Sequence, residues 1–316
     1  MERREILVAT LLAGIVGGTD KNNFAGTMMD SGKPLPRRRY KDDVDLSVIG
    51  FGGIILLGMS QREANAAVAE AVGCGVNYFD VAPSYGRGEA EEALGLALAS
   101  ERKKVFLACK TMEREARGAG ADLTRSLKRL RTDHLDLYQF HAVTKENEVE
   151  RIFAAGGAIE TVVRARDEGK VRYIGFSAHS EAAAFAMMDR FSFDSVLFPF
   201  NLVCYAQGRF GPAVMERAKK EGVSRLALKM LARGPWPEGV TKAYPNTWYQ
   251  PIDDPGGARV AVRFTLSEDV TAAIPPGDIR LFRLAVAMAG EFSLLAAEER
   301  EQILAETARM TPLFRS

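Results

Sequence analysis

The sequence from Gly75 to Gly95, GVNYFDVAPSYGRGEAEEALG, joins an apolar, strand-like run to a helix-like run through a loop rich in glycine. The apolar run ends in Asp80, and the loop that follows carries Tyr85. A buried carboxylate is costly in free energy unless a cation or hydrogen-bond donors pair with it. We therefore expect a cation to reach Asp80 from a neighbouring element.

The next two apolar runs, VFLACK and LDLYQFH, end in Lys110 and His141. In a parallel barrel with helical connections, the carboxyl ends of the strands lie on one face, and active sites are built on that face. Lys110 is the expected partner of Asp80. The sequence thus predicts that Lys110 and His141 converge with Asp80 and Tyr85.

Short apolar runs alternate with helix-like segments from Leu46 to near the C-terminus, which is typical of repeated strand-helix units. The predicted strands are 47–53, 77–82, 105–110, 135–141, 171–178, 195–200, 225–231 and 270–275. A further helix is expected at 296–310, and long loops at 142–156 and 234–255. The predicted fold class is α/β, a (β/α)8 TIM barrel with an N-terminal extension and an additional C-terminal helix.

The composition excludes some classes of partner. The formal net charge is +1, with 42 Lys and Arg against 41 Asp and Glu, which gives no basic field for a nucleic acid. Cys74, Cys109 and Cys204 form no CxxC or His-Cys cluster, so we expect neither a metal site nor a disulfide framework. A small molecule is the expected partner.

Residues 1–37 are predicted to be a leader-like segment and linker, and residues 38–316 the barrel. Paired Arg3 and Arg4 precede a short apolar run, which is typical of a secretory or twin-arginine leader. The run is shorter than the ~20 apolar residues that span a bilayer. The expected location is therefore either cytoplasmic or exported through this leader. Asn23 to Lys41, rich in Gly, Pro, Arg and Lys, is predicted to be a linker.

The motifs NYFDVAPSYG, CKT, DLYQFH, IGFSAHS and AIPPGD follow one another in this order. In this combination the chain resembles the aldo-keto reductases, over nearly everything from Arg38 to Ala305. The resemblance implies reduction of an aldehyde or ketone to an alcohol with NADPH, or alternatively NADH. It also implies that Tyr85 is the general acid and that His141 orients the carbonyl. Lys110 and Asp80 would be the pair that tunes the phenol.

The chemistry accounts for these residue types. Hydride delivery to a carbonyl carbon leaves alkoxide character on the oxygen, which a proton donor must neutralise. A free tyrosine, with a pKa of ~10, is a slow donor at neutral pH. The Lys110 ammonium is expected to lower the pKa of Tyr85. His141 would add a second hydrogen bond to the developing oxyanion.

The resemblance also implies where the nicotinamide binds, and here the chain departs from the family. Ser177 remains from the serine-asparagine pair that holds the carboxamide. Ala178, Leu197 and Leu228 stand where asparagine, glutamine and tyrosine are expected. Lys229, Phe198 or an aromatic residue of the 234–255 loop would have to substitute for them.

The phosphate end of the cofactor is expected at the last strand-to-helix turn. Pro276, Gly277 and Arg280 lie there, and barrels often bind phosphate through the helix N-terminal amides at this turn. Arg280 is the expected contact for a 2′-phosphate, which favours NADPH. Gly53 ends the first strand, where a glycine allows a ligand to approach the backbone closely.

Two other functions stay open. A lyase or aldolase-type barrel would use Lys110 or Lys229 as a Schiff-base nucleophile. A non-catalytic nucleotide-binding sensor or scaffold would explain the altered nicotinamide pocket. Of the other histidines, His134 precedes its strand and is expected to be structural, whereas His179 is either structural or a substrate contact. The aromatic loop 234–255 is expected to be a lid or binding loop.

Overall fold

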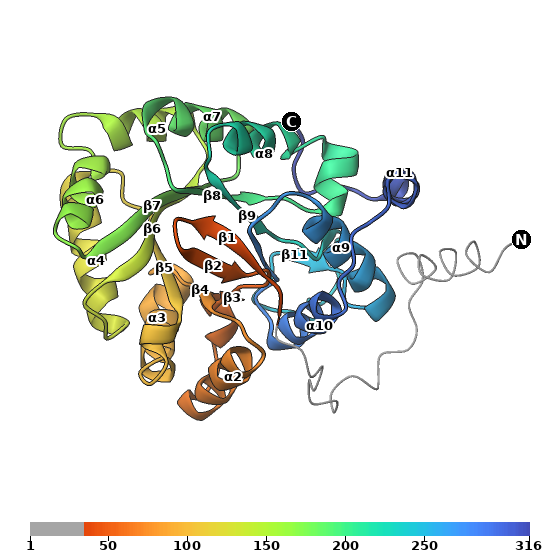
Figure 1. Ribbon diagram of the computed structural model, residues 1–316, viewed down its shortest axis with the longest axis horizontal. Helices are drawn as coiled ribbons and strands as arrows, with labels where there is room; N and C mark the ends of the chain where they lie inside the picture. The colour runs from red at the N-terminus through yellow and green to blue at the C-terminus, as the bar shows by residue number, and fades with distance from the viewer. Residues whose placement is uncertain (1–34) are drawn as a thin grey trace, which may run out of the picture.

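The structure is a computed structural model that describes residues 35–316. Eight parallel strands form one sheet in the order β12-β9-β8-β7-β6-β5-β4-β3. A parallel bridge between Ile49 and Ala273 joins the two ends of this order. The sheet therefore closes into a barrel with helices around it (Figure 1), and the predicted (β/α)8 fold is confirmed.

The barrel strands are β3 (Phe51–Gly52), β4 (Tyr78–Asp80), β5 (Phe106–Thr111), β6 (Leu135–Val143), β7 (Val171–Ala178), β8 (Ser195–Pro199), β9 (Ser224–Leu228) and β12 (Ala272–Ile274). The surrounding helices are α2 (Gln61–Gly73), α3 (Glu89–Ala97), α4 (Ala116–Arg129), α6 (Ala158–Asp167), α7 (Glu181–Arg190), α8 (Pro212–Lys220), α9 (Pro255–Ser267) and α10 (Ile279–Gly290). The additional C-terminal helix is α11 (Ala297–Glu306).

Local sequence signals explain several of these boundaries. All residues of β8 are buried, as expected for a strand of a parallel sheet that is covered on both faces. Ser60 begins α2 through a capping box with Glu63. Asp254 caps α9, and Pro255 stands in its first turn, where a missing N–H costs no hydrogen bond.

A hairpin of β1 (Arg37–Lys41) and β2 (Val44–Ser47) lies across one end of the barrel (Figure 1). Tyr40 packs on Phe106, with 5.0 Å between ring centroids, and its hydroxyl lies 3.0 Å from the Oγ of Ser195, the first residue of β8. This hairpin thus closes the amino ends of the strands and leaves the carboxyl ends for the site. The predicted linker was wrong for Arg37–Lys41, because the buried ring of Tyr40 pins this segment to the barrel.

Both predicted long loops contain regular structure. The loop 142–156 holds α5 (Glu146–Phe153), which buries Val149 and Ile152. In the aromatic loop, β11 (Tyr249–Pro251) pairs with β10 (Ala232–Pro235). The leader predicted for residues 1–37 lies, up to residue 34, outside the described residues.

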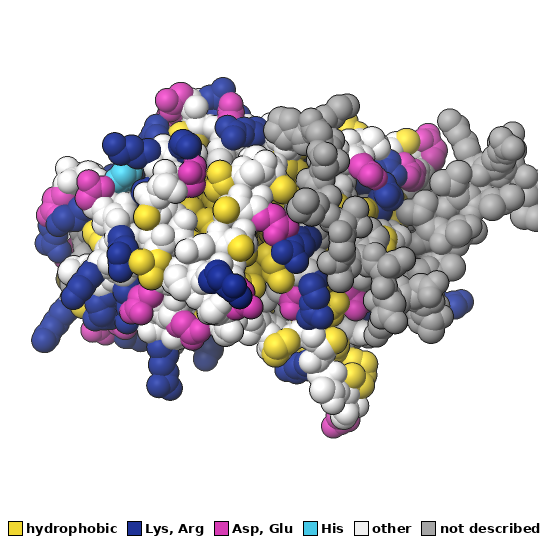
Figure 2. All heavy atoms as spheres, turned by 90° about the horizontal axis from the view of Figure 1, so that it is seen from below, with side chains coloured by type: hydrophobic (Ala, Val, Ile, Leu, Met, Phe, Trp, Pro, Cys, Tyr) yellow, Lys and Arg dark blue, Asp and Glu magenta, His cyan; other side chains and the backbone are white. Residues whose placement is uncertain are grey.

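The surface carries charges of both signs. On the face shown in Figure 2, Lys and Arg side chains lie beside Asp and Glu side chains, in keeping with the net charge of +1. No helix within residues 35–316 is long and apolar enough to cross a membrane.

Candidate active site

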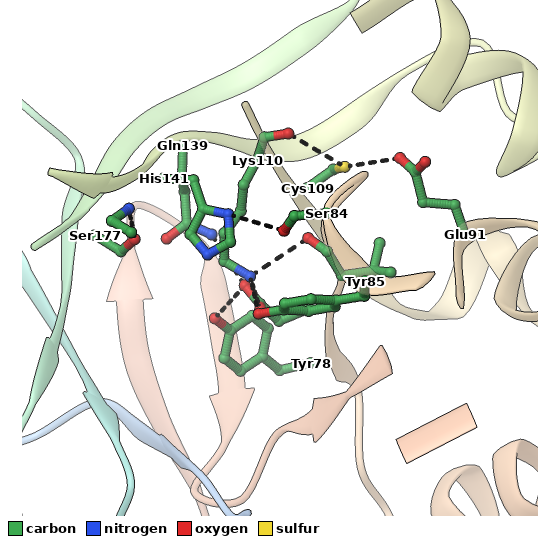
Figure 3. Close-up of polar contacts among 12 residues, drawn as sticks. Tyr78, Ser84, Tyr85, Glu91, Cys109, Lys110, Gln139, His141 and Ser177 are labelled. Carbon is green, nitrogen blue, oxygen red and sulfur yellow. Dashed lines mark hydrogen bonds and ion pairs between the residues drawn. The ribbon is translucent and has the colours of Figure 1, made fainter. Parts of the chain in front are cut away.

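Lys110 is the central side chain of a cluster at the carboxyl ends of β4 and β5. Its ammonium forms an ion pair with Asp80, and the two side chains are 1% and 3% exposed. The same Nζ lies 3.3 Å from the hydroxyl of Tyr85 (Figure 3). It also lies 3.4 Å from the carbonyl oxygen of Val81. The cation expected beside Asp80 is therefore Lys110, and it also touches the phenol.

The loop that carries Tyr85 has an unusual backbone. Gly86, Arg87 and Gly88 have φ values of 61°, 55° and 102°, so three successive residues are left-handed. A Cβ on Gly88 would lie 2.2 Å from the guanidinium of Arg129, which itself forms an ion pair with the buried Glu91 at 3.0 Å. Only glycine fits this conformation and this contact without strain. The guanidinium of the Glu91–Arg129 pair therefore packs directly against the loop at Gly88.

His141 lies beside Tyr85, with the rings edge to face and 5.9 Å between their centroids. Its Nδ1 lies 3.4 Å from the Oγ of Ser84 (Figure 3), and its backbone oxygen accepts a hydrogen bond of 2.7 Å from Arg114. Arg114 is held in turn by Glu148 on α5. The structure thus brings together all four side chains that the sequence selected for the catalytic group.

Burial and neighbouring charges set the protonation states in this cluster. Burial raises the pKa of Tyr85, and the Lys110 ammonium only partly opposes that shift. The expectation of a net lowering was wrong, because desolvation of the phenolate outweighs the lysine. Burial alone would lower the pKa of Lys110, but Asp80 and then Tyr85 hold it above its ordinary value. Burial, and after it Lys110, lowers the pKa of His141 well below its usual range.

Two polar partners of Asp80 were missed in the sequence. Gln139 donates to an Asp80 carboxylate oxygen at 2.9 Å, and the Tyr78 hydroxyl donates to it at 3.3 Å. Strand alternation could have found Gln139, which stands two residues before His141 and pairs in register with Lys110. Tyr78 precedes Asp80 on β4 by the same spacing.

The ends of β7, β8 and β9 form the other half of the barrel mouth. Ser177 is buried, and its Oγ accepts a hydrogen bond of 2.7 Å from the backbone N–H of Ala142. Leu197 and Leu228 belong to the apolar cluster inside the barrel. The positions where the resemblance led us to expect glutamine and tyrosine therefore face inward and are apolar.

Lys229 follows the last residue of β9 and is only 7% exposed. Its Nζ lies 3.4 Å from the Nε2 of His179. Burial lowers the pKa of Lys229 to about 8; the thiol of Cys204 partly opposes this shift, and the charge of Lys110 adds to it. Burial and Lys229 lower the pKa of His179 to about 3, so this ring is neutral near pH 7. The contact therefore joins an ammonium to a neutral imidazole acceptor.

Aromatic rings from two distant segments cover Lys229. Its Nζ lies 5.6 Å from the ring centroid of Trp248 and 6.0 Å from that of Tyr249, both in the 234–255 loop. It also lies 5.9 Å from the ring of Phe314, near the C-terminus. The tail that carries Phe314 was missed because nothing in its local sequence marks a contact with the mouth.

The residues selected for the phosphates lie around the turn from β12 to α10. Pro276 and Gly277 are buried, and a Cβ on Gly277 would lie 2.7 Å from Ile54. The side chain of Arg280 is 59% exposed and forms two hydrogen bonds of 2.9 Å with Asp278, the cap of α10. Gly53 packs so closely that a Cβ would lie 2.7 Å from Val81. Packing alone thus accounts for the two glycines, whereas Arg280 offers a surface cation.

Among residues 35–316, no group of three His, Cys, Asp or Glu side chains is placed to hold a metal ion. The arrangement offers instead a buried ion pair in contact with a phenol, and a neutral imidazole beside it. Such groups can supply a proton and hydrogen bonds to an oxygen that gains negative charge.

Comparison with protein families agrees with this geometry. The family model described as "Aldo/keto reductase family" matches residues 48–248, which is more than half of the chain. The chain therefore belongs to the aldo/keto reductase family.

Individual relatives are more distant. The chain is 28% identical to an uncharacterized oxidoreductase of Bacillus subtilis over 221 residues, which is 66% of this chain and 67% of that protein. It is 34% identical to an aldo-keto reductase of Schizosaccharomyces pombe, named with NADP(+), over 63% of this chain and 62% of that protein. A solved aldo-keto reductase from Bacillus halodurans, in its holo form, superimposes with a TM-score of 0.69 at 25% identity. That superposition covers 87% of this chain and 97% of the other.

Proposed function

We propose that this protein reduces an aldehyde or ketone to an alcohol with NADPH as the hydride donor. The observation that carries the proposal is the position of the Lys110 ammonium, in contact with the Asp80 carboxylate and 3.3 Å from the Tyr85 hydroxyl. A phenol held protonated beside a fixed cation is a proton donor ready for an oxygen that becomes negative. The relatives named as aldo-keto reductases support the same reaction class.

In this proposal Tyr85 is the general acid. Burial keeps its proton on the phenol at neutral pH, because it raises the pKa of Tyr85. As the carbonyl oxygen gains negative charge, the phenol donates its proton, and the neighbouring Lys110 ammonium stabilises the phenolate that remains. Asp80 fixes the lysine, and neutral His141 donates an N–H to the same oxygen, which orients the carbonyl.

The charged and polar side chains around the mouth fit an anionic dinucleotide. Arg280 would contact a 2′-phosphate, and the turn at Pro276 and Gly277 would lie along the phosphates. The hydroxyl of Ser177, whose oxygen already accepts from Ala142, keeps its proton free to donate to the carboxamide. Gly53 borders the same edge, and Lys229 is the further cation that the sequence grouped with the cofactor. When bound, NADPH would supply the hydride for the carbonyl carbon.

The Tyr85→Phe variant tests the proposal, because it removes the proton donor and little volume. We expect its kcat to fall by about 10²- to 10⁴-fold, the usual contribution of a general acid. Its affinity for NADPH, followed by nucleotide fluorescence, should stay close to that of the wild type. Tyr173→Phe is the matched control, since it removes a hydroxyl that contacts Asp42 at the opposite end of the barrel. Equal activity of Tyr85→Phe and wild type would contradict the mechanism.

One observation favours a second candidate, a Schiff-base enzyme. Lys110 is unsuited as a nucleophile, because Asp80 raises its pKa and keeps it protonated. Lys229 has a pKa of about 8 and aromatic surroundings, which resemble the conditions that activate a lysine. Borohydride treatment with an aldehyde, without NADPH, distinguishes the two. A stable adduct on Lys229 would support the second candidate, and its absence supports the reductase.

A further inference from the structure

Lys229 differs from Lys110 in what surrounds its charge. Lys110 has Asp80 as its counter-ion. Around Lys229, residues 35–316 place no carboxylate within ion-pair distance, and its polar side-chain contact is the uncharged ring of His179. A buried ammonium without a counter-charge is costly. The site is therefore short of one negative charge.

The backbone at Lys229 is also unusual. Its φ is 62°, in the left-handed region, and its carbonyl oxygen accepts a hydrogen bond of 2.8 Å from the N–H of Ala232. Glycine would adopt this turn without strain, whereas a lysine there costs free energy. Strain of this kind is concentrated at functional positions. The strained backbone therefore indicates that the Lys229 side chain has a functional role in the barrel mouth.

The charge of Lys229 acts on one of the groups proposed for catalysis. Its charge contributes to the lowered pKa of His141, after burial, Lys110, His179 and Arg114. Tyr249, whose ring is 6.0 Å from the Lys229 Nζ, has a pKa that burial raises and that Tyr85 raises further. The side chains around the ammonium are His179, Trp248, Tyr249 and Phe314, and none of these four belongs to the β12–α10 turn.

We propose that Lys229 binds a carboxylate on the substrate, so that the preferred substrates are aldehydes or ketones that also carry a carboxylate group. This inference rests on the proposed reductase function and names the substrate class of the same site. The carboxylate would supply the missing negative charge, and the Lys229 ammonium would donate a charge-assisted hydrogen bond to it. The rings of Trp248 and Phe314 would cover the pair and exclude water, which strengthens it.

A binding experiment tests the anion site without turnover. Protein loaded with NADP+ is titrated calorimetrically with benzoate and with benzamide, which have nearly the same shape and differ in charge. We expect the wild type to bind benzoate about 10- to 100-fold more tightly than benzamide, the range for a hydrogen bond to a charged group. Lys229→Met should abolish that preference, and Lys229→Arg should restore part of it. Lys242→Met, which removes an exposed lysine from the same loop as Trp248, is the control and should keep it.

A kinetic experiment then links the site to the reaction. Two aldehydes of nearly the same shape, para-carboxybenzaldehyde and para-formylbenzamide, are compared by their kcat/KM values. The ratio of the two values should fall about 10- to 100-fold in Lys229→Met. A wild type that binds or reduces both members of each pair equally well would overturn the proposal. So would a Lys229→Met variant that binds NADPH about 10-fold more weakly but keeps its carboxylate preference, since Lys229 would then serve the nucleotide. A borohydride-trapped adduct on Lys229 would equally overturn it.

Failure of the reductase function can be told apart from failure of the anion site. If no carbonyl is reduced but Lys229→Met still loses the preference for benzoate, the carboxylate site stands and the proposed reaction is wrong. If turnover depends on Tyr85 but kcat/KM is the same for the charged and the neutral aldehyde, the proposed reaction is supported and the carboxylate site is wrong.

Discussion

The two halves of the barrel mouth differ in whether their buried charges have ion-pair partners. At the ends of β4, β5 and β6, each buried charge has a partner: Lys110 is paired with Asp80, which also accepts from Gln139, and Arg114 is paired with Glu148. At the ends of β7, β8 and β9, Leu197 and Leu228 are apolar, and Lys229 contacts the ring of His179, with no carboxylate of residues 35–316 within ion-pair distance.

In the first half, the protein itself supplies a partner for each buried charge. In the second half, a bound ligand would have to supply the partner of Lys229. A preorganised ion pair stabilises charge in a transition state without rearrangement at the moment of reaction. An unpaired buried cation, by contrast, lowers the stability of the free protein and is satisfied on binding an anion. In our proposals, the first half serves proton transfer and the second half binds the substrate.

The largest expected effect separates the two lysines directly. Lys110→Met leaves Asp80 buried and unpaired, which should lower the free energy of unfolding by about 3–5 kcal/mol. Lys229→Met removes a buried cation that has no carboxylate partner among residues 35–316, so we expect stability to stay constant or to rise. Urea unfolding of the three proteins, with equal m-values as a check on the unfolded state, measures both. Equal losses in the two variants would mean that Lys229 has a counter-ion that residues 35–316 do not provide.

The sequence predicted the first half of the mouth better than the second. Asp80, Lys110 and His141 each end an apolar run, and barrel topology alone requires such strand ends to converge. Lys229 directly follows β9, but the aromatic rings beside it come from the 234–255 loop and from Phe314 in the tail. Contacts between segments so far apart in the chain depend on tertiary packing, which no local pattern encodes.

The same contrast holds for the fold. Strands such as β7 were predicted to the residue, because an apolar run with polar flanks defines its own limits. The hairpin strand Arg37–Lys41 was missed, because its basic sequence is typical of a linker and only Tyr40 is buried in the barrel end. Helix α5 was missed because only Val149 and Ile152 mark its buried face, too few to show a helical period.

A second, smaller effect concerns how stability depends on pH through His179, at the ends of β7, β8 and β9. His179 has a pKa of about 3 in the folded protein, lowered by burial and by Lys229, against ~6.5 when unfolded. Below about pH 6.5 the unfolded chain therefore binds a proton that the native protein does not. Stability is lost as the pH falls, and between about pH 7 and pH 5 this histidine should account for about 2 kcal/mol of the loss.

The variant His179→Asn should lose about 2 kcal/mol less stability than the wild type over that pH interval. Urea unfolding at both pH values measures the difference. His134→Asn is the control, because His134 is half-exposed beside Asp133 away from the mouth. An unchanged slope in His179→Asn would mean that this ring is already protonated in the native protein, and that the second half of the mouth tolerates a second positive charge.

The smallest effect is expected at Arg280, outside the two halves. Its guanidinium is already shared with Asp278 and with the carbonyl oxygen of Ala243, and it stacks 4.5 Å from the ring centroid of Tyr244. Because solvent screens an exposed pair and Asp278 offsets part of the charge, Arg280→Met should weaken NADPH binding by only about 10-fold, or about 1.4 kcal/mol. NADH, which lacks the 2′-phosphate, should bind both proteins equally.

Arg283→Met is the matched control for this last prediction, since Arg283 lies on the same helix and forms an ion pair with Glu70 at 2.8 Å. Fluorescence titration with NADPH and NADH measures the affinity of each variant for both nucleotides, and only Arg280→Met should lose affinity for NADPH. The contrary outcome is that Arg280→Met weakens the binding of NADH as much as that of NADPH. In that case the arginine would act by holding the 234–255 loop through Ala243 rather than by binding the 2′-phosphate. The preference that we expect for NADPH would then have to come from a cation other than Arg280, and the 2′-phosphate would lie away from the N-terminus of α10.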